Sequence, residues 1–431
     1  MTRPLSVAVA GLGTVGAGVL TLLRDNAAIV AARAGRPIAV TAVSARDRSK
    51  DRGIPLSGLR WYEDPVALAA DPEIDVVVEL IGGSDGPARD LVEAALAAGK
   101  PVVTANKAML AVHGASLAAA AEARNAPLAF EAAVAGGIPV IKALREGLAG
   151  NRISRIAGIL NGTCNYILTQ MRERGREFAE VLADAQKLGY AEADPSFDVD
   201  GIDAAHKLAI LAALAFGRPV AFDAVHVEGI RRISALDIAF ATELGYRIKL
   251  LGLAQRTESG GIAARVHPCM VPHSAPIARV DGVFNAVVAE GDFVGRVMLE
   301  GRGAGAGPTA SAVVADLVDL ARNRFTPVWG AAASSLSAAP SVPMSAHVGA
   351  YYLRLMVVDR PGVIADVTAV LRDDGISLES MLQRGRSPGE AVPVVLVTHE
   401  TEERRMGAAL ERIAALDAVL EAPTLIRIEV G

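Results

Sequence analysis

One predicted helix carries a lysine and an aspartate one turn apart. The stretch 203–216 favours a helix, and its only full charges are Asp203 and Lys207. Residues i and i+4 lie one above the other on a helix, so the two side chains share a face. Ile210 and Leu214 continue that face, which indicates that the pair lies where the helix enters the interior. A partly buried lysine held by a carboxylate can exchange a proton with a substrate oxygen. The alternative is a surface ion pair worth about 0.3–0.5 kcal/mol.

The segment before this helix is rich in acidic residues. It reads Gly-Tyr-Ala-Glu-Ala-Asp-Pro over 189–195, and its carboxylates are Glu192, Asp194, Asp198 and Asp200. The Asp194-Pro195 step disfavours helix at Asp194, and Pro195-Ser196 predicts a turn. We therefore expect an acidic loop that leads into the helix.

The N-terminus holds a glycine motif that binds dinucleotides in other proteins. A predicted strand at 5–10 runs directly into Gly11, Leu12, Gly13, Thr14, Val15 and Gly16, and a helix is expected over 15–24. Gly11 suits the tight turn, Gly13 lets the backbone approach a pyrophosphate, and Gly16 lets the helix pack on the strand. The helix N-terminus then faces the anion. Because the motif stands between a strand and a helix, we favour this interpretation over a structural glycine turn.

The second predicted strand, 38–44, indicates which nucleotide binds. Folds specific for NAD carry an acid at the end of this strand, where it binds the ribose 2′-hydroxyl. Here Arg46 stands at the strand tip and Asp47 follows it. Arg46 can bind a 2′-phosphate, so we favour NADP, while Asp47 leaves NAD open. The alternative for Arg46 is a solvated charge on the loop.

Further positions follow the ends of predicted strands. An apolar strand at 74–81 ends in Gly82 and Gly83, a helix is expected over 88–98, and a strand at 101–104 ends in Thr104, shortly before Lys107. Ligands of open parallel sheets bind beyond the carboxyl ends of the strands. We therefore place these residues at the cofactor cleft, although a lysine after a strand is by itself more often a surface residue.

The middle of the chain offers two weaker signals. A strand at 128–131 precedes the glycine-rich turn 135–137 and a helix at 140–148. The turn exposes carbonyls beside Glu131, which suits a hard cation, although a tight turn explains the pattern as well. A strand at 153–160 runs into residues 161–166, which include Cys164, and a helix then continues to about residue 173. No base stands near it in sequence, so we expect a buried thiol.

The second half of the chain predicts two more units. Short apolar runs and turns over 248–297 indicate antiparallel strands, in which His267 and His273 have structural roles. The glycine-rich loop 301–309 opens a helix over 310–322 and suggests a return to the cofactor cleft through Gly305 and Gly307. After an Ala/Ser/Pro-rich linker at 331–348, the order βαββαβ follows.

Composition narrows the class of protein. The chain has 431 residues, of which 52% are hydrophobic, and a formal net charge of −5. This length predicts two or three folded domains. The mild negative charge, with no basic block, argues against nucleic acid. Two cysteines do not make a disulfide framework, and no long uncharged span argues for a membrane, so we expect a cytoplasmic protein.

Taken together, these motifs resemble the homoserine dehydrogenase family, in its monofunctional form with an ACT domain. The resemblance covers essentially the whole chain. It rests on GLGTVG at 11–16, VTANK at 103–107, residues 131–139, NGTCNY at 161–166, LGYAEADP at 188–195, Asp203 to Lys207 and GAGAGPTASAV from Gly303. Cys164 departs from it, since the family more usually shows threonine there.

The resemblance implies an α/β fold with three parts. They are a Rossmann-type domain at 1–130, to which a helix at 310–325 returns, an α+β substrate and dimerisation domain with a mixed sheet at 131–309, and a ferredoxin-like ACT domain at 350–431. It implies a homo-oligomer, dimer or tetramer, and threonine as effector of the ACT domain.

It also implies a reaction and roles for single residues. The reaction is reversible reduction of L-aspartate 4-semialdehyde to L-homoserine with NAD(P)H, on the route to threonine, methionine and isoleucine. Lys207 donates the proton and Asp203 holds it. Substrate residues are Glu192, Asp198, Asp203, Lys107, Gly162, Thr163 and Tyr190. A sodium site is implied at Glu131 with the carbonyls of Val134, Gly136 and Ile138. A zwitterionic substrate explains the crowding of carboxylates.

Two other functions fit parts of this pattern. A dehydrogenase that phosphorylates a semialdehyde through a cysteine would need Cys164 as thiolate. A non-catalytic amino-acid sensor would bind its ligand at 350–431, but it would have no need of Lys207, Glu192 and the glycine loop.

Overall fold

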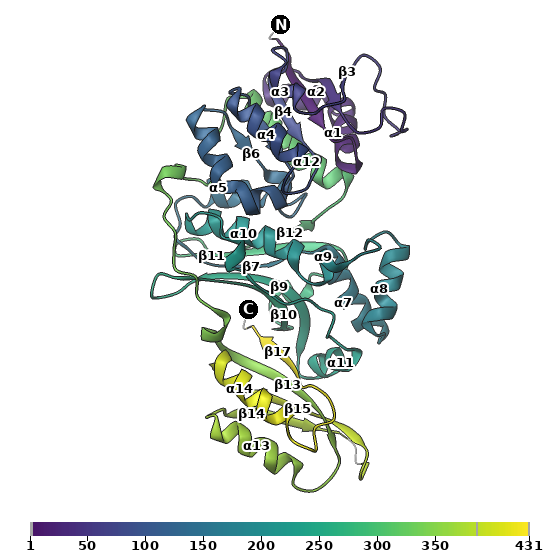
Figure 1. The fold of residues 1–431 in the computed structure, drawn as a ribbon, viewed down its shortest axis with the longest axis vertical. Helices are drawn as coiled ribbons and strands as arrows, with labels where there is room; N and C mark the ends of the chain where they lie inside the picture. The colour runs from purple at the N-terminus through teal and green to yellow at the C-terminus, as the bar shows by residue number, and fades with distance from the viewer. Residues whose placement is uncertain (1–2, 385–386, 430–431) are drawn as a thin grey trace.

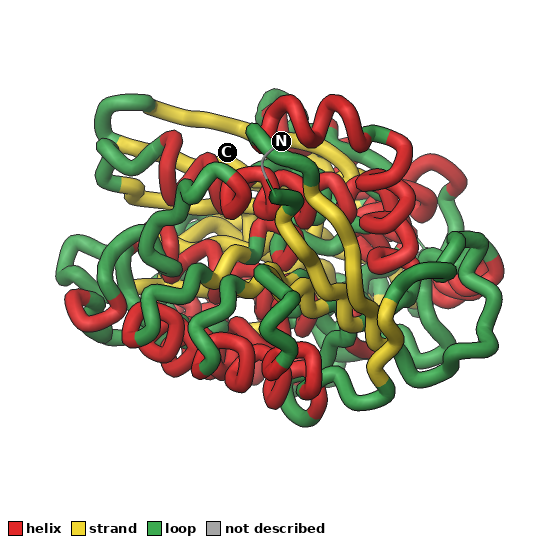
Figure 2. The backbone as a smooth tube through the Cα atoms, turned by 90° about the horizontal axis from the view of Figure 1, so that it is seen from above, coloured by secondary structure: helices red, strands yellow, loops and turns green. Residues whose placement is uncertain are grey.

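The protein is built on two β-sheets. A computed structural model describes residues 3–384 and 387–429, and the account below concerns these residues (Figure 1). The first sheet has six strands and the second has eleven. Seen along the long axis of the molecule, helices lie on both sides of the strands (Figure 2).

The N-terminal sheet is parallel, with strand order β3-β2-β1-β4-β5-β6. Its strands are β1 (Leu5–Ala10), β2 (Ile38–Ser44), β3 (Arg60–Tyr62), β4 (Val76–Glu79), β5 (Val102–Thr104) and β6 (Leu128–Ala129). Its helices are α1 (Thr14–Asp25), α2 (Ala27–Ala34), α3 (Ala67–Ala70), α4 (Pro87–Ala97) and α5 (Lys107–Ala123). The order reverses between β1 and β4, and such a switch point forms a crevice for a dinucleotide. The prediction of a Rossmann-type sheet is confirmed.

A late helix returns to this sheet. Helix α12 (Ala306–Ala321) packs against α1, and a Cβ added at Gly18 would lie only 2.7 Å from the carbonyl oxygen of Ala306. The predicted return of the chain is therefore observed, although the helix begins four residues before the expected Ala310.

The second sheet is mixed, with the order β12-β11-β7-β9-β10-β17-β13-β15-β14 and two short strands beside it. The strands that the middle of the chain contributes are β7 (Ile153–Ile159), β8 (His226–Val227), β9 (Tyr246–Arg256), β10 (Ile262–Pro272), β11 (Phe284–Gly291) and β12 (Gly295–Arg302). The helices of this part are α7 (Gly162–Arg174), α8 (Phe178–Lys187), α9 (Ser196–Val199), α10 (Ile202–Phe216) and α11 (Ala235–Glu243).

Helix α10 lies between the two sheets. It contacts α5 of the N-terminal part on one side and β7, β9 and β10 on the other. Every residue from Asp203 to Leu214 is buried. A helix that is apolar almost all round belongs in an interior, so its two charges need partners there.

The C-terminal module has the predicted βαββαβ order. Its elements are β13 (Val348–Val358), α13 (Val363–Asp373), β14 (Leu378–Gln383), β15 (Ala391–Thr398), β16 (Thr401–Glu402), α14 (Glu403–Ala414) and β17 (Thr424–Ile428). Strand β17 pairs in parallel with β10, with Cys269 opposite Arg427. The module therefore extends the central sheet, a connection that the sequence did not predict. The sequence predicts a last strand over 424–430, whose end at Val430 lies outside the described residues.

Several predicted boundaries are wrong. Strand β4 covers Val76–Glu79 rather than 74–81, because the Glu79 side chain accepts the N–H groups of Ile81 and Gly82. The expected turn at Pro195-Ser196 opens the short helix α9 instead.

Three further segments also differ from expectation. Beyond β6 the chain forms a 3-10 turn (Glu131–Ala133) in place of strand, and the helix expected at 140–148 is α6 (Val140–Lys142) followed by a π-turn (Ala143–Gly147). The linker contains two 3-10 turns (Ala333–Ser335 and Met344–Ala346). Two more such turns are Phe222–Ala224 and Pro276–Arg279.

Among the described residues, no single helix has the length and apolar composition needed to cross a membrane. The pair α1 and α2, bent by 83°, meets both criteria only when its two helices are taken together.

Candidate active site

Lys207 is held by two partners inside the protein. Its Nζ donates to Asp203 Oδ2 at 2.7 Å and to the carbonyl oxygen of Leu160, just after β7, at 2.7 Å. The Lys207 side chain is 10% exposed. An ammonium has three hydrogens, and these partners take two, which leaves one for an oxygen in the cleft. The predicted pair is therefore buried, and it is no surface ion pair.

Asp203 is the centre of the polar cluster. Its Oδ1 lies 3.3 Å from Nζ of Lys107, and its Oδ2 accepts from Lys207 and from the Asn161 amide at 2.8 Å. Burial favours the neutral acid, but the two lysine charges and the hydrogen bonds outweigh it and lower the pKa of Asp203 to about 2. Asp203 is therefore ionised at neutral pH.

Asn161 joins the half-buried Asp198 to the buried Asp203, a role that the sequence analysis missed. Its Nδ2 donates to Asp198 at 2.7 Å as well as to Asp203, and its Oδ1 caps α7 by accepting the N–H of Cys164 at 2.8 Å. Asn161 is 4% exposed. Burial raises the pKa of Asp198, and the nearby charge of Asp203 adds to this effect. Helix α7 begins at Gly162, earlier than predicted, and an asparagine directly after the predicted strand was the available signal for an N-cap.

Lys107 reaches this cluster from the other sheet. It is the first residue of α5, after β5, and its Nζ also lies 5.9 Å from the ring centre of Phe197. The side chain is 32% exposed. The structure therefore brings the carboxyl edge of the N-terminal sheet to the Asp203–Lys207 pair, as the predicted placement of Lys107 required.

The loop before α9 forms an exposed rim. Thr163 Oγ1 donates to the carbonyl oxygen of Tyr190 at 2.8 Å, and the Tyr190 ring packs on Tyr166 at 4.9 Å between centroids. Gly162 begins α7, where an added Cβ would lie 2.8 Å from the Val283 carbonyl. Glu192 is exposed, whereas Asp198 and Asp203 are bridged by the Asn161 amide. The structure thus brings Asp198 close to the Asp203–Lys207 pair, whereas Glu192 lies exposed in the loop.

The glycine loop has the geometry expected of a nucleotide cradle. Gly11 has φ +98°, and a Cβ there would lie 2.4 Å from the carbonyl oxygen of Leu80. A Cβ at Gly16 would lie 2.1 Å from the Gly11 carbonyl, whereas one at Gly13 would meet no atom within 4 Å. The outer glycines are thus needed for packing, and the middle one leaves its backbone open to a ligand. Leu12, Thr14 and Val15 complete the turn into α1.

A network at the ends of β4 and β5 holds the next part of the cleft. Glu79, fully buried, accepts the Thr104 hydroxyl at 2.5 Å and the N–H groups of Ile81 and Gly82. Asn106 donates to the Gly83 carbonyl at 2.7 Å. Glu79 and Asn106 were not predicted as site residues. The signal was an acid ending an apolar strand immediately before a glycine pair.

The basic loop after β2 lies beside the cradle. Arg52 donates to the Leu12 carbonyl at 3.2 Å, and the guanidinium groups of Arg48 and Arg52 lie 5.9 and 5.7 Å from the Trp61 ring centre. Arg46 is exposed. The Asp47 carboxylate accepts both the N–H and the hydroxyl of Ser49, which lowers its pKa. Asp47 is therefore engaged in its own turn.

The predicted cation loop is tightly curled. Ala135 and Gly136 have φ of 56° and 48°, and Gly137 N–H donates to the Arg302 carbonyl at 3.0 Å. Glu131 is 2% exposed and accepts the N–H groups of Ile141 and Lys142, both at 2.9 Å. Its donor set of one carboxylate and carbonyls fits a hard cation.

The electrostatics of Glu131 favour a positive partner. Burial raises its pKa to about 7, and the buried carboxyl of Asp316 adds to the shift. Nζ of Lys142 lies 3.3 Å from Oδ1 of Asp316 and 2.5 Å from Oδ2 of Asp319, so a single lysine charge is shared by several carboxylates. A cation at Glu131 would offset the remaining negative charge.

The two cysteines are buried thiols. Cys164 Sγ donates to the Asp198 carbonyl at 3.2 Å. Burial, together with the charges of Asp198 and Asp203, raises the pKa of this thiol well above its ordinary value. A thiol held in that state is a poor nucleophile, which agrees with the structural role expected for it.

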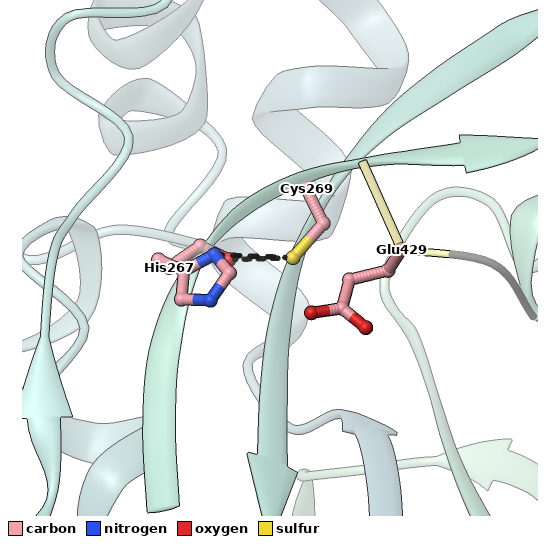
Figure 3. Close-up of side chains that lie close together, drawn as sticks. All are labelled: His267, Cys269 and Glu429. Carbon is pink, nitrogen blue, oxygen red and sulfur yellow. Dashed lines mark hydrogen bonds between the residues drawn. The ribbon is translucent and has the colours of Figure 1, made fainter. Parts of the chain in front are cut away.

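His267 lies in a cluster that the sequence analysis did not foresee. Ligand-type atoms of His267, Cys269 and Glu429 come within 4.8 Å of one another (Figure 3). Cys269 Sγ is 3.2 Å from His267 Nδ1, but that nitrogen also faces the Pro268 carbonyl at 3.0 Å. Glu429 accepts from Arg265 at 2.6 Å and from Arg155 at 3.4 Å. A metal ion would have to displace these contacts, so the cluster joins β10 to β17, and the structural role expected for His267 stands.

Comparison with known proteins places this arrangement in a family. Family models match three regions: "Homoserine dehydrogenase, NAD binding domain" at 11–131, "Homoserine dehydrogenase" at 139–318 and "ACT domain" at 351–418. The chain is 50% identical over 438 residues to a homoserine dehydrogenase of Pseudomonas aeruginosa and 47% over 433 residues to that of Neisseria gonorrhoeae, covering 99% of each chain.

Solved structures agree. A homoserine dehydrogenase from Thiobacillus denitrificans, 50% identical, superposes with a TM-score of 0.94 over 99% of both chains. A hyperthermophilic archaeal homoserine dehydrogenase in complex with NADPH, 28% identical, gives 0.64 over 76% of this chain and all of the other. The chain therefore belongs to the homoserine dehydrogenase family, whose members are NAD(P)-dependent oxidoreductases that act on a CH–OH group.

Proposed function

We propose that the protein interconverts L-aspartate 4-semialdehyde and L-homoserine, with Lys207 as the proton donor and acceptor at the substrate oxygen. A bound nicotinamide supplies the hydride, so the chain must bind, orient and move one proton. The observation that carries the proposal is the Lys207 ammonium, which has two hydrogens engaged and a third available. Asp203 holds the amine in place by a hydrogen bond, and Lys107 joins the pair to the carboxyl edge of the N-terminal sheet.

The acids around the pair suit the amino end of the substrate. Asp198 and Asp203 are fixed by Asn161, and Glu192 is exposed in the loop that precedes α9. We infer that these carboxylates bind the substrate ammonium, with Lys107, Gly162, Thr163 and Tyr190 lining the same entrance.

We propose NADP as the preferred nucleotide. Asp47, the residue that would bind a ribose 2′-hydroxyl, has its carboxylate occupied by Ser49, while Arg46 is exposed at the tip of β2. The nucleotide would contact residues 11–16, Arg46, Gly82, Gly83, Thr104, Lys107, Gly305 and Gly307. Gly305 has φ +118°, and it precedes α12, which packs on the helix that follows the cradle.

A monovalent cation, sodium, is proposed at Glu131 with the carbonyls of Val134, Gly136 and Ile138. The raised pKa of Glu131 supports it, because a buried acid pair is costly without a compensating charge. The loop 135–137 packs on 302–304, near the start of α12, so the cation would stabilise the junction between the parts.

The remaining proposals concern regulation, assembly and location. Domain limits of 1–130, 131–309 and 350–431, with the linker at 331–348, are supported by the two sheets and the βαββαβ order.

Threonine is proposed as effector of the ACT domain, and a cytoplasmic homo-oligomer, dimer or tetramer, as the working form. The hairpin tip between β11 and β12 exposes 90% of Phe293, which suits a subunit contact.

One spectrophotometric assay tests the function. Purified protein with L-aspartate 4-semialdehyde should oxidise NADPH faster than NADH at equal concentration, and threonine should slow it. A protein that bound threonine but oxidised neither nucleotide would be a sensor, and the proposed reaction would be wrong.

A further inference from the structure

An arginine of the ACT domain is tied to a loop of the catalytic part. Arg427 of β17 makes a bidentate ion pair with Glu228, with Nη to Oε distances of 2.8 and 2.9 Å. The Arg427 side chain is 5% exposed, and it also contacts Glu403 of α14. Two carboxylates from different parts of the chain thus converge on one buried guanidinium. Bidentate pairs of this kind fix orientation as well as charge.

Glu228 begins the segment 228–231, here called the clamp segment. Its N–H donates to the Val266 carbonyl at 2.7 Å, which fixes the start of the segment beside β10. A Cβ added at Gly229 would lie 2.2 Å from the Val199 carbonyl oxygen and 2.5 Å from Cα of Asp200. The clamp segment therefore lies in direct backbone contact with the end of α9.

Two more contacts bind the clamp segment to α9. The N–H of Ile230 donates to the Val199 carbonyl at 2.8 Å. Arg231 pairs with Asp200 at 2.5 and 3.1 Å and donates to the Ser196 hydroxyl at 3.0 Å. Helix α9 has only four residues and also packs on α7 and α10, so the clamp segment is one of the three neighbours that fix its position.

Asp198 belongs to helix α9 and lies close to the Asp203–Lys207 pair. The Asp198 carboxylate accepts from Asn161, which also holds Asp203. A continuous set of contacts thus runs from Arg427 through Glu228 and the clamp segment to Asp198.

We propose that Arg427 and Glu228 are positioning residues for substrate binding, through which the ACT domain sets the place of Asp198. The inference rests on the proposed role of Asp198 at the substrate ammonium. Loosening the pair would let α9 move, which would weaken binding of the amino end without altering Lys207 or the nucleotide cradle. The expected signature is a higher KM for the semialdehyde, with kcat and the KM for NADPH nearly unchanged.

The chain offers a matched control at the same domain boundary. Arg354 of β13 pairs with the buried Asp237 of α11 at 2.6 Å, and its side chain is 9% exposed. Helix α11 contacts the chain beyond the far end of α7, where Ala235 N–H donates to Glu177 at 3.2 Å. This pair therefore joins the same two parts without touching α9.

The experiment compares Arg427→Lys, Glu228→Gln and Arg354→Lys in the full chain. We expect the first two to raise the KM for L-aspartate 4-semialdehyde by about 2- to 30-fold, and Arg354→Lys to leave it unchanged. Thermal unfolding of each variant shows that it is folded. Glu228→Gln alters a side chain that is 41% exposed, so it serves if the buried Arg427 variant is unstable.

A double-mutant test links the effect to Asp198. In an Asp198→Asn background, Arg427→Lys should raise KM no further, because both changes act on one contact. Equal KM changes in Arg427→Lys and Arg354→Lys would overturn the inference, as would fully additive effects with Asp198→Asn. A wild-type protein inactive with the semialdehyde would instead refute the proposed function.

Discussion

Lys107 and Asp203 meet across the boundary between the two sheets, with Nζ 3.3 Å from Oδ1. Lys107 opens a helix of the N-terminal sheet, and Asp203 stands in the first turn of the buried helix α10. This contact brings the carboxyl edge of a nucleotide-binding sheet to the side chain that holds Lys207. The position of Lys207, the proposed proton donor, relative to the nucleotide-binding sheet therefore depends on Asp203. The Asp203 carboxylate is contacted by Lys207, Asn161 and Lys107.

Replacing Asp203 by Asn should impair turnover more than binding. The change keeps the shape of the side chain but removes the charge that aims Lys207, and misplacement of a catalytic group by about 1 Å costs roughly 10²-fold. We expect kcat to fall about 10²-fold in steady-state assays with NADPH. A variant with kcat within twofold of the wild type would show that Asp203 does not position the lysine.

The charge of Asp203 also makes the stability of the fold decrease in acid. The folded-state pKa of about 2 is below the ordinary value of 3.8. A lowered pKa stabilises the fold above the ordinary value, and this stabilisation, about 2 kcal/mol, is lost as pH falls from about 4 to about 2. Denaturant unfolding of the wild type should therefore weaken more steeply over this window than that of Asp203→Asn. Parallel pH curves for the two proteins would contradict the assignment.

The parts of this site that depend on local backbone and helix geometry could be predicted from the sequence. The glycines of the cradle and the Asp203–Lys207 spacing obey local rules of backbone and helix geometry, so their positions were predicted. Asn161 was missed because its function is to bridge Asp198 and Asp203, which are 37 and 42 residues away. The pairing of β17 with β10 was missed for the same reason, since no local pattern reveals a parallel contact between distant strands.

Cys164→Ser should keep its activity. The thiol is fully buried, its pKa is raised, and a serine hydroxyl can make the same hydrogen bond to the Asp198 carbonyl. We expect kcat/KM within about threefold of the wild type, since removal of a weak thiol donor changes little. Abolished NADPH oxidation in a variant that remains folded would support thiol chemistry instead.

Sodium should stabilise the fold through Glu131. The folded-state pKa of about 7 exceeds the ordinary 4.5, so ionisation of Glu131 weakens the fold as pH rises from about 4.5 to about 7. A bound cation reverses this loss, by about 2.7 kcal/mol at a concentration 100 times its Kd. NaCl should therefore raise the thermal midpoint by several degrees at pH 8, and by less at pH 5.

Choline chloride at equal ionic strength is the control salt, and Glu131→Gln is the control variant. The variant should show the same midpoint in both salts. If sodium and choline shift the wild-type midpoint alike, the effect is general screening and the site at Glu131 is wrong.

Arg46→Ala should change the choice of nucleotide. A guanidinium bonded to a phosphate contributes about 1.5–3 kcal/mol, so the KM for NADPH should rise about 10- to 100-fold, while the KM for NADH stays the same. Arg24→Ala, which removes an exposed arginine paired with its neighbour Asp25 on α1, is the matched control. Equal increases in the KM for NADPH and for NADH would show that Arg46 attracts both nucleotides alike. Arg46 would then not be the residue that binds the 2′-phosphate.

The central claim is that Lys207 moves the proton at the substrate oxygen, and Lys207→Ala tests it most directly. With L-aspartate 4-semialdehyde and NADPH, kcat should fall by about 10²- to 10⁴-fold while the variant stays folded and still binds NADPH. Turnover close to that of the wild type in a folded variant would contradict the account.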